Sequence, residues 1–297
     1  MQHAIEQEPD RPLWRRIVDF PLSALVIGVW IFACIVTVEA LFQKWHPSMA
    51  KMEFTVLFAL LNVALCLIAD KLLLRHLGEH PRDDLRFRGA GAQLGLGVLI
   101  GLVLFAAVVG IAAMVGAYRI LSCCSTAQLL ILLFGAGITA AVTEEFFFRG
   151  ILFRWIEEFA GSWAALLVTA LLFGLAHRAN PNATWFSSFA IAVEAGILLG
   201  GAYMLTRSLW LPIGLHAAWN FAEGYIFDVP VSGLPEQGLV TAKLSGPVLL
   251  SGGDFGLEAS VIAVVIAGSA GAWFVWTAAA RRGQLVQPWW VRKRDLA

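Results

Sequence analysis

Charged residues are scarce in this chain of 297 residues. Asp, Glu, Lys and Arg together make up 14% of the sequence, whereas hydrophobic residues make up 59%, and this balance excludes an ordinary water-soluble globular domain. The 21 basic and 21 acidic residues cancel, so the chain has no net positive charge with which to attract nucleic acid. Cysteine is scarce as well: four residues, two of them adjacent at Cys123 and Cys124, do not make the disulfide framework of a small secreted domain. These absences predict a membrane protein without a nucleic-acid partner.

Long apolar runs, by contrast, fill most of the sequence. A helix needs about 20 mostly apolar residues to cross a bilayer, and about eight runs of this kind can be recognised. They lie at approximately residues 21–41, 54–70, 92–117, 127–150, 162–177, 184–206, 209–228 and 257–279. We therefore predict an all-α, polytopic membrane helix bundle over residues 21–279, preceded by an N-terminal segment (1–20) and followed by a basic tail (280–297).

The basic residues indicate how this bundle is oriented. With the N-terminus inside, the segments predicted to lie outside hold only five of the 21 Lys and Arg residues. These five are Lys44, Lys51, Arg119, Arg178 and Lys243. Cytoplasmic segments of membrane proteins carry an excess of Lys and Arg, so both termini are predicted to be cytoplasmic, in a multi-pass protein of the plasma (inner) membrane surrounded by its lipid bilayer.

A few polar side chains interrupt the apolar runs, where an ionisable group near the bilayer centre costs roughly 3 kcal/mol. They are Glu39, Glu144, Glu145, His177, Glu194, His216, Asn220 and Glu223. The fourth run contains an E-E-x-x-x-R pattern of Glu144, Glu145 and Arg149. Glu145 and Arg149 are four residues apart and share a helix face, so Arg149 is expected to neutralise Glu145. Glu144 points about 100° away around the helix and is therefore expected to be available for chemistry.

The helical rise predicts that several of these side chains meet. Glu144 and His177 each lie about 16 residues from a predicted turn at Ala160-Gly161, which puts both roughly 24 Å from that turn. His216 and Asn220 occupy one helix face, a turn apart, and His216 lies about 12 Å from the inner turn that precedes its helix. We therefore expect a site in the cytoplasmic half of the bilayer.

The sixth run is expected to pack closely at about this depth, because Gly196, Gly200 and Gly201 have no side chains. Glu194 in the same run lies about 9 Å further outward. We expect it to form a hydrogen bond between helices.

Three of these patterns together resemble a known family. E-E-x-x-x-R at Glu144–Arg149, F-x-x-x-H at Phe173–His177 and H-x-x-x-N at His216–Asn220 follow one another on consecutive spans. In this order they are similar to the motifs of the CPBP family, which comprises CAAX prenyl endopeptidases and bacterial homologues of the abortive-infection type. The resemblance covers approximately residues 125–225 and implies an intramembrane protease.

Peptide hydrolysis requires an activated water and a group that stabilises the oxyanion. We predict that Glu144 is the general base and that His177 orients the water or transfers a proton. His216 and Asn220 would donate hydrogen bonds to the oxyanion. The resemblance implies that Glu145 and Arg149 also matter for activity.

A metal-dependent version of this chemistry remains open. Two His and one Glu form a common catalytic zinc set, and Glu144, His177 and His216 would then be the ligands of a divalent metal such as zinc. The H-E-x-x-H helix that often supplies such ligands is absent. In either version the expected partner is a membrane-embedded or lipidated protein or peptide, cleaved near the cytoplasmic leaflet.

Two other functions are compatible with the same residues. An ion-coupled transporter could use Glu39, Glu144, Glu194 and His177 as a relay through the bilayer, although the internal repeat typical of transporters is not seen. A non-catalytic membrane scaffold could retain the motifs as structural hydrogen bonds.

Overall fold

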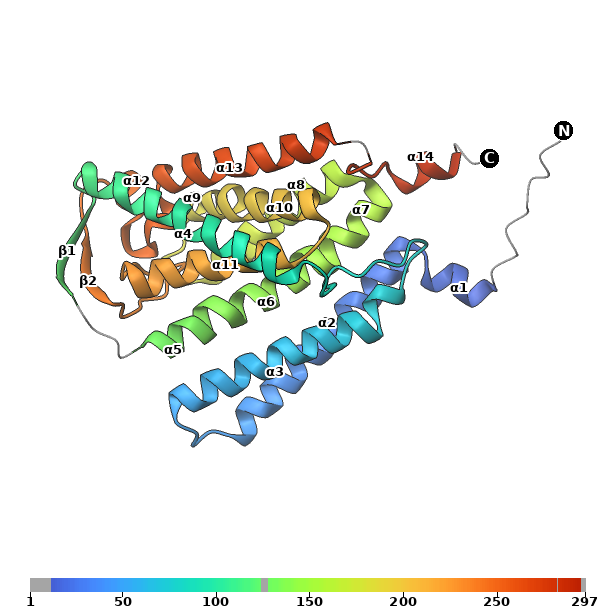
Figure 1. Cartoon of the computed structure of the whole chain (residues 1–297), viewed down its shortest axis with the longest axis horizontal. Helices are drawn as coiled ribbons and strands as arrows, with labels where there is room; N and C mark the ends of the chain where they lie inside the picture. Colours follow the sequence, from blue (N-terminus) through green and yellow to red (C-terminus); the bar gives the residue numbers. More distant parts are fainter. Residues whose placement is uncertain (1–11, 124–127, 282, 295–297) are drawn as a thin grey trace.

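The computed structural model of the chain describes residues 12–123, 128–281 and 283–294 as an elongated bundle of helices (Figure 1). Seven helical segments in this described part are long and apolar enough to cross a membrane: Pro21–Trp45, Lys51–His76, Ala90–Met114, Leu129–Ala160, Ser162–Ala179, Trp185–Thr206 and Val261–Ala280. The other predicted run forms a helix of 12 residues that continues into a helical turn of five residues, Trp210–Phe221 and Ala222–Ile226. The helical membrane bundle is thus confirmed, while the number of crossings and the side of the termini stay predictions.

The described residues form the following helical elements. The α-helices are α1 (Leu13–Val18), α2 (Pro21–Trp45), α3 (Lys51–Leu72), α4 (Ala90–Met114), α5 (Leu129–Leu132), α6 (Ala140–Glu145), α7 (Arg154–Ala160), α8 (Ser162–Ala176), α9 (Trp185–Ile191), α10 (Leu198–Thr206), α11 (Trp210–Phe221), α12 (Val248–Ser251), α13 (Val261–Ala280) and α14 (Trp289–Arg294). Wider π-helical segments are η2 (Leu133–Thr139), η3 (Phe146–Phe153), η5 (Ala192–Ile197) and η6 (Ala222–Ile226), and short 3-10 turns are η1 (Leu74–His76), η4 (His177–Ala179), η7 (Gly253–Phe255) and η8 (Leu257–Ala259).

Local sequence explains where several helices begin and end. Pro21, at the start of α2, needs no backbone hydrogen-bond partner there. Thr184 and Ser187 form a reciprocal capping box at the start of α9. Gly161 separates α7 from α8 with a φ of 86°, which glycine adopts at no steric cost. These signals position the helices that carry the polar residues.

The surface of the bundle is apolar. Large side chains such as Val26, Trp30, Leu167 and Trp276 are more than half exposed, and similar residues cover the long helices. A water-soluble protein rarely exposes so large an apolar area, so this surface is expected to face lipid.

Burial differs strongly between the helices. In the most apolar window of Trp185–Thr206, 67% of the residues are buried, compared with 17% for Pro21–Trp45. The hairpin of α2 and α3 lies at the edge of the bundle in Figure 1. The predicted close packing at the glycines of the central segment is confirmed, because a side chain at Gly196 would overlap Ala170 of α8. Glycines also bring α4 onto α11, where a Cβ at Gly97 would overlap the backbone of Leu211.

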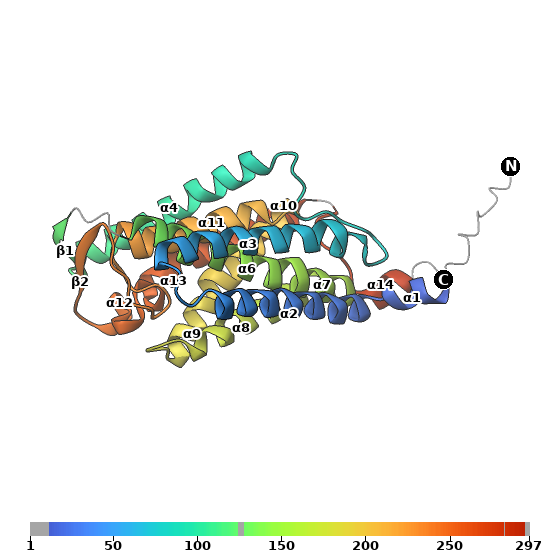
Figure 2. The same cartoon turned by 90° about the horizontal axis from the view of Figure 1, so that it is seen from below.

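The two ends of the bundle are different. Both views place α1 and α14 at one end, and a β-ribbon with α12 at the other (Figures 1 and 2). The ribbon pairs β1 (Tyr118–Cys123) with β2 (Val240–Leu244) in antiparallel register. These two strands were not predicted from the sequence, because strands this short lack a long alternating pattern. Cys124 lies outside the described residues.

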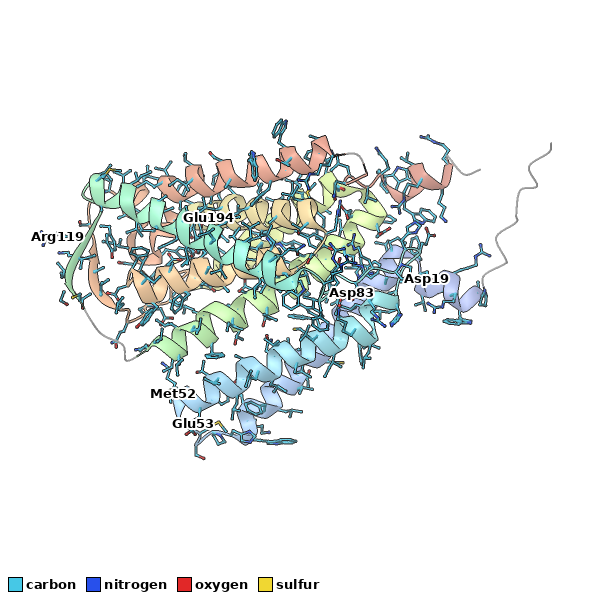
Figure 3. All side chains as sticks on the ribbon, viewed as in Figure 1. Asp19, Met52, Glu53, Asp83, Arg119 and Glu194 are labelled. Atoms are coloured by element: carbon cyan, nitrogen blue, oxygen red, sulfur yellow. The ribbon has the colours of Figure 1, made fainter. Side chains whose placement is uncertain are left out.

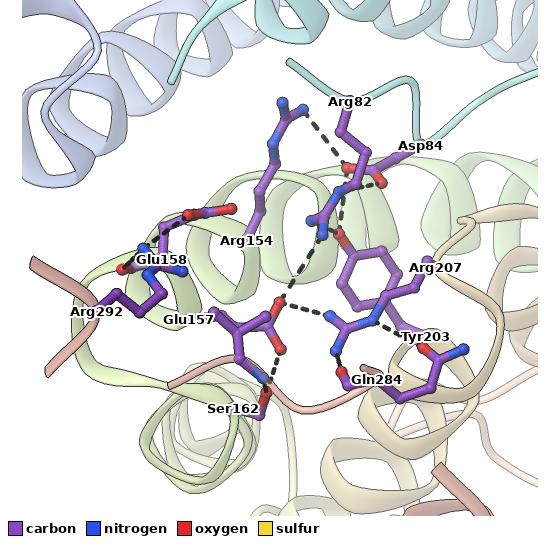
Figure 4. A network of polar contacts seen from close by, with 11 residues as sticks. Arg82, Asp84, Arg154, Glu157, Glu158, Ser162, Tyr203, Arg207, Gln284 and Arg292 are labelled. Atoms are coloured by element: carbon purple, nitrogen blue, oxygen red, sulfur yellow. Dashed lines mark hydrogen bonds and ion pairs between the residues drawn. The ribbon is translucent and has the colours of Figure 1, made fainter. Parts of the chain in front are cut away.

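At the end near α1 and α14, a group of polar side chains joins the connecting segments (Figure 4). We call this group the end network; its members are Arg82, Asp84, Arg154, Glu157, Ser162, Tyr203 and Arg207. Asp84 binds Arg82 at 2.8 Å and Arg154 at 3.5 Å, and Glu157 binds Arg207 and accepts a hydrogen bond from Ser162 at 2.6 Å. Each buried carboxylate of this network therefore has a cationic partner.

Candidate active site

The E-E-x-x-x-R pattern lies in the middle of one long helix. Residues Ala140–Glu145 form α6, and wider π-helical segments precede and follow it. Such segments often occur at functional sites because they change the direction in which side chains point. Arg149 Nη1 donates to Glu145 Oε1 at 2.8 Å, and both side chains are fully buried. The predicted pair is thus formed.

Arg149 also links this helix to the segment Trp185–Thr206, the central helix of the bundle. Its Nη2 donates to the backbone oxygen of Ala195 at 3.0 Å, and its guanidinium lies 4.7 Å from the centre of the Phe173 ring. Glu145 Oε1 in turn accepts from His216 Nδ1 at 2.9 Å. One carboxylate therefore holds both Arg149 and His216, which connects the first motif to the third.

Glu144 and His177 meet, as the depth count predicts. The distance from Glu144 Oε2 to His177 Nε2 is 3.8 Å, and 28% and 13% of the two side chains are exposed. The His177 ring is fixed from behind, because its Nδ1 lies 2.8 Å from the backbone oxygen of Phe173 and the ring stacks on the Phe173 side chain. A carbonyl oxygen can only accept, so Nδ1 carries the hydrogen and the lone pair of neutral His177 is on Nε2, facing Glu144.

Asn220 lies one turn beyond His216 on the same face of α11. Its Nδ2 donates to the backbone oxygen of Ala136 at 3.0 Å, which uses one of its two N–H groups. His216 and Asn220 both line the same cavity as Glu144 and His177. The structure therefore brings all three motifs together.

The cavity has a volume of about 130 Å³, which is room for a few water molecules or for the end of one side chain. Its wall includes residues of α6, α8, η5 and α11 and also Val231–Glu236 from the loop that follows η6. This loop lies at the end of the bundle opposite α1 and α14. The cavity thus extends beyond the half of the bundle in which rise counting placed the site, because the loop folds back onto the helices and buries Val229 and Val231.

Residues 126–222 match the family model described as Type II CAAX prenyl endopeptidase Rce1-like. This match covers about a third of the chain and supports membership of the CPBP family. All six predicted site residues fall inside the matched segment, and membership of this family implies a CAAX-type protease of the membrane. No curated protein and no solved structure matches the chain significantly.

The CPBP motifs leave other polar residues of the cavity unexplained. Glu194 is buried and lines the cavity, yet neither of its carboxylate oxygens has a hydrogen-bond partner in the described part of the chain. The prediction that Glu194 forms a hydrogen bond between helices is therefore wrong. Glu194 interacts electrostatically with Glu258, which also lines the cavity. The buried Glu223 interacts with both but is not part of the cavity wall. We call these three residues the pocket carboxylates.

A support behind the helix that carries Glu144 was not predicted from the sequence. Asn62 of α3, fully buried, donates to Glu39 of α2 at 2.7 Å and to the hydroxyl of Thr143 at 2.8 Å. Thr143 directly precedes Glu144, so Asn62 ties the peripheral hairpin to the site. A lone Asn inside an apolar run is the signal that could have identified it. Glu39 is engaged here and does not line the cavity, so it does not join the relay expected for a transporter.

A metal site is not assembled from the predicted ligands. Among the residues that the structure describes, no group of three or more His, Cys, Asp and Glu side chains is placed to hold a metal ion. One ring nitrogen of His216 binds Glu145 and one of His177 binds a carbonyl. Nε2 stays free on both rings, so the metal set of Glu144, His177 and His216 stays a prediction, and the chemistry below is written without a metal.

Proposed function

We propose that the protein is an intramembrane endopeptidase that hydrolyses a peptide bond of a membrane-embedded or lipid-anchored protein, with a water molecule activated by Glu144 and His177. The observation that carries this proposal is the pair itself: a carboxylate and an imidazole nitrogen lie 3.8 Å apart in a cavity inside an apolar bundle. This separation is too long for a direct hydrogen bond and suits a water molecule that binds to both groups.

The hydrogen-bond pattern supports a division of roles. The water donates one hydrogen to Glu144 and the other to the Nε2 lone pair of His177, which leaves an oxygen lone pair for attack on the peptide carbonyl carbon. Glu144 takes the proton as the bond to carbon forms, and the proton then passes to the leaving amine as the C–N bond breaks. His177 acts through its fixed orientation, because Phe173 holds the other side of the ring.

His216 and Asn220 are the proposed stabilisers of the oxyanion. Glu145 holds Nδ1 of His216, so Nε2 is the ring nitrogen left for the substrate. The second N–H of Asn220 is the other available donor. Glu145 and Arg149 are positioning residues in this scheme, since they contact His216 and the backbone of the central helix rather than the cavity.

The substrate class follows from the surface that surrounds the cavity. Because the long helices expose apolar side chains, a substrate that is itself embedded in the bilayer or attached to it by a lipid reaches the cavity from the membrane. We retain the orientation indicated by the basic residues, with α1 and α14 on the cytoplasmic side of the inner membrane.

The test compares the N- and C-termini of membrane proteins, by mass spectrometry, in cells that express wild type or Glu144→Gln at equal levels. We expect new termini that depend on Glu144, and these termini also identify the substrate. Glu53→Gln is the matched control, because Glu53 is an exposed Glu at the tip of the α2–α3 hairpin, far from the site (Figure 3). Identical termini in wild type and Glu144→Gln, also when the protein is overproduced, would contradict the proposal and favour a scaffold or transporter.

A further inference from the structure

The carboxylate of Glu194 is buried in the cavity without a partner. Only 2% of the residue is exposed, and neither carboxylate oxygen has a hydrogen-bond partner among the described residues. Figure 3 shows Glu194 inside the bundle, whereas Asp19 and Arg119 lie near its two ends. A carboxylate without a partner is strongly unfavourable in an apolar interior. Glu194 therefore needs either a proton or a cation that comes from outside the chain.

Apart from His177 and His216, the ionisable residues of the cavity wall are all carboxylates. Glu144, Glu194, Glu236 and Glu258 belong to the wall, and no Lys or Arg is among its described residues. The nearby cations are engaged elsewhere, since Arg149 binds Glu145 and is not part of the wall. A cavity lined by carboxylates and surrounded by apolar groups concentrates a negative potential, which attracts a cation.

Glu258 and Glu194 differ in what satisfies them. Glu258 accepts hydrogen bonds from the Trp219 indole at 3.2 Å, the Ser232 backbone N–H at 2.9 Å and the Ser232 hydroxyl at 2.7 Å. Glu194 has no such donors. The two carboxyl groups interact electrostatically. Glu194 is thus the side chain with free acceptor capacity, and Glu258 strengthens the attraction for a cation.

We propose that this part of the cavity is a subsite for a positively charged side chain of the substrate, a Lys ammonium or an Arg guanidinium, with Glu194 as its anchor. The proposal rests on the proteolytic function above, because Glu144 and His177 line the same cavity. A volume of about 130 Å³ fits the end of one such side chain rather than a lipid chain. A metal ion is a poorer match, since no group of three suitable ligands in the described chain is placed to hold one.

The subsite can be tested before any substrate is known. Dicyclohexylcarbodiimide adds to protonated carboxyl groups in apolar surroundings, and mass spectrometry identifies the labelled residue. The full-length protein in phosphatidylcholine vesicles is labelled in the presence of n-butylguanidinium or of the neutral control n-butanol. We expect n-butylguanidinium to halve the labelling of Glu194 at a concentration about tenfold below that of n-butanol, a difference of roughly 1.4 kcal/mol.

Glu39 is the internal control, because it is buried but lies outside the cavity. Its labelling should respond equally to both compounds. Equal protection of Glu194 by the two compounds would overturn the proposal and leave Glu194 as a protonated structural group. Absence of label on Glu194 without either compound, while Glu39 is labelled, would overturn it too, because the carboxylate would then already be paired.

A second test uses the cleavage sites that depend on Glu144. In Glu194→Gln, the ratio of sites with Lys or Arg near the cut to sites without them should fall about tenfold, and Glu194→Asp should restore part of it. Cleavage with an unchanged ratio would reject the subsite and leave the protease intact as a proposal. Absence of any cleavage dependent on Glu144 would reject the protease, while the protection by n-butylguanidinium would still decide whether the cation subsite exists.

Discussion

Two groups of buried polar residues in this bundle are satisfied in opposite ways. In the end network, the carboxylates Asp84 and Glu157 each bind arginines, and Ser162 and Tyr203 supply further hydrogen bonds (Figure 4). Among the pocket carboxylates, Glu194 and Glu223 are just as buried, yet no Lys or Arg is among the described residues that line the cavity of Glu194.

The difference separates structure from function. Buried charges that are paired and hydrogen-bonded hold elements together, and breaking such a group is costly. Buried carboxyl groups without a counter-charge contribute little to folding and are typical of sites that bind or react. The end network joins α7 to the loop before α4 and to the segment before α14. Two of the pocket carboxylates, Glu194 and Glu258, line the same cavity as the proposed catalytic pair.

The largest effect is expected for Glu157→Gln in the end network. Removing this charge leaves Arg207 without its buried partner, which should lower the free energy of unfolding by about 3–5 kcal/mol. Thermal unfolding of the purified protein in detergent measures the loss. The control is Glu158→Gln, because Glu158 pairs with the more exposed Arg292 and should cost less than about 1 kcal/mol. Equal effects of the two substitutions would show that the network is not a structural element.

An intermediate loss of stability is expected for Asn62→Leu. Asn62 belongs neither to the end network nor to the pocket carboxylates. Asn62 is neutral and joins Glu39 to Thr143, so its loss leaves buried polar atoms without partners and should cost about 1–3 kcal/mol. Thr143→Val removes only one of the two bonds and should cost less. If Thr143→Val proves the more harmful of the two in the same unfolding assay, the link through Asn62 is not what stabilises this region.

A much smaller effect on stability is expected for Glu194→Gln. The carboxylate has no hydrogen-bond partner in the described chain, so its replacement should change the free energy of unfolding by less than about 1 kcal/mol, and an increase in stability is an acceptable outcome. Glu157→Gln is the direct comparison in the same assay. A loss at Glu194 as large as the loss at Glu157 would erase the distinction between the two groups.

The smallest effect concerns the surface contact that holds α14. Burial opposes ionisation of Glu79, but hydrogen bonds and the charge of Lys293 outweigh it and lower the pKa of Glu79 below its usual 4.5. A lowered pKa means that the contact contributes to stability above about pH 4.5 and that the contribution disappears as the pH falls through the lowered value. The difference in free energy of unfolding between wild type and Glu79→Gln, measured by thermal unfolding at a series of pH values, should be small at neutral pH, on the order of 0.5 kcal/mol, and absent in acid. A stability difference between the two proteins that grows in acid would contradict this role of the contact between Glu79 and Lys293.

Much of this architecture was predictable because its signals are local. Each predicted apolar run coincides with a helical segment. The four-residue spacing predicts the bond between Glu145 and Arg149, and the helical rise predicts that Glu144 and His177 meet. Both depend only on regular helix geometry.

The features that were not predicted depend on how neighbouring helices are rotated about their axes and on the paths of loops. That Glu145 would also bind His216 depends on how α6 and α11 are rotated toward each other. Ser232 reaches the cavity because the loop after η6 folds back, and there it donates to Glu258 of η8. No periodic pattern in the sequence marks such a fold. The short β-ribbon was not predicted either, because no periodic pattern marks its strands.

The central claim is that Glu144 and His177 act on one water molecule. The most direct test measures cleavage of a site that depends on Glu144, using purified protein in vesicles, for wild type, Glu144→Gln, His177→Gln and the double variant. Each single substitution should slow cleavage by about 10²–10⁴-fold. If both residues hold the same water, the double variant should be no slower than the slower single variant. A rate reduced by the product of the two single effects would show that they act independently and would contradict this account.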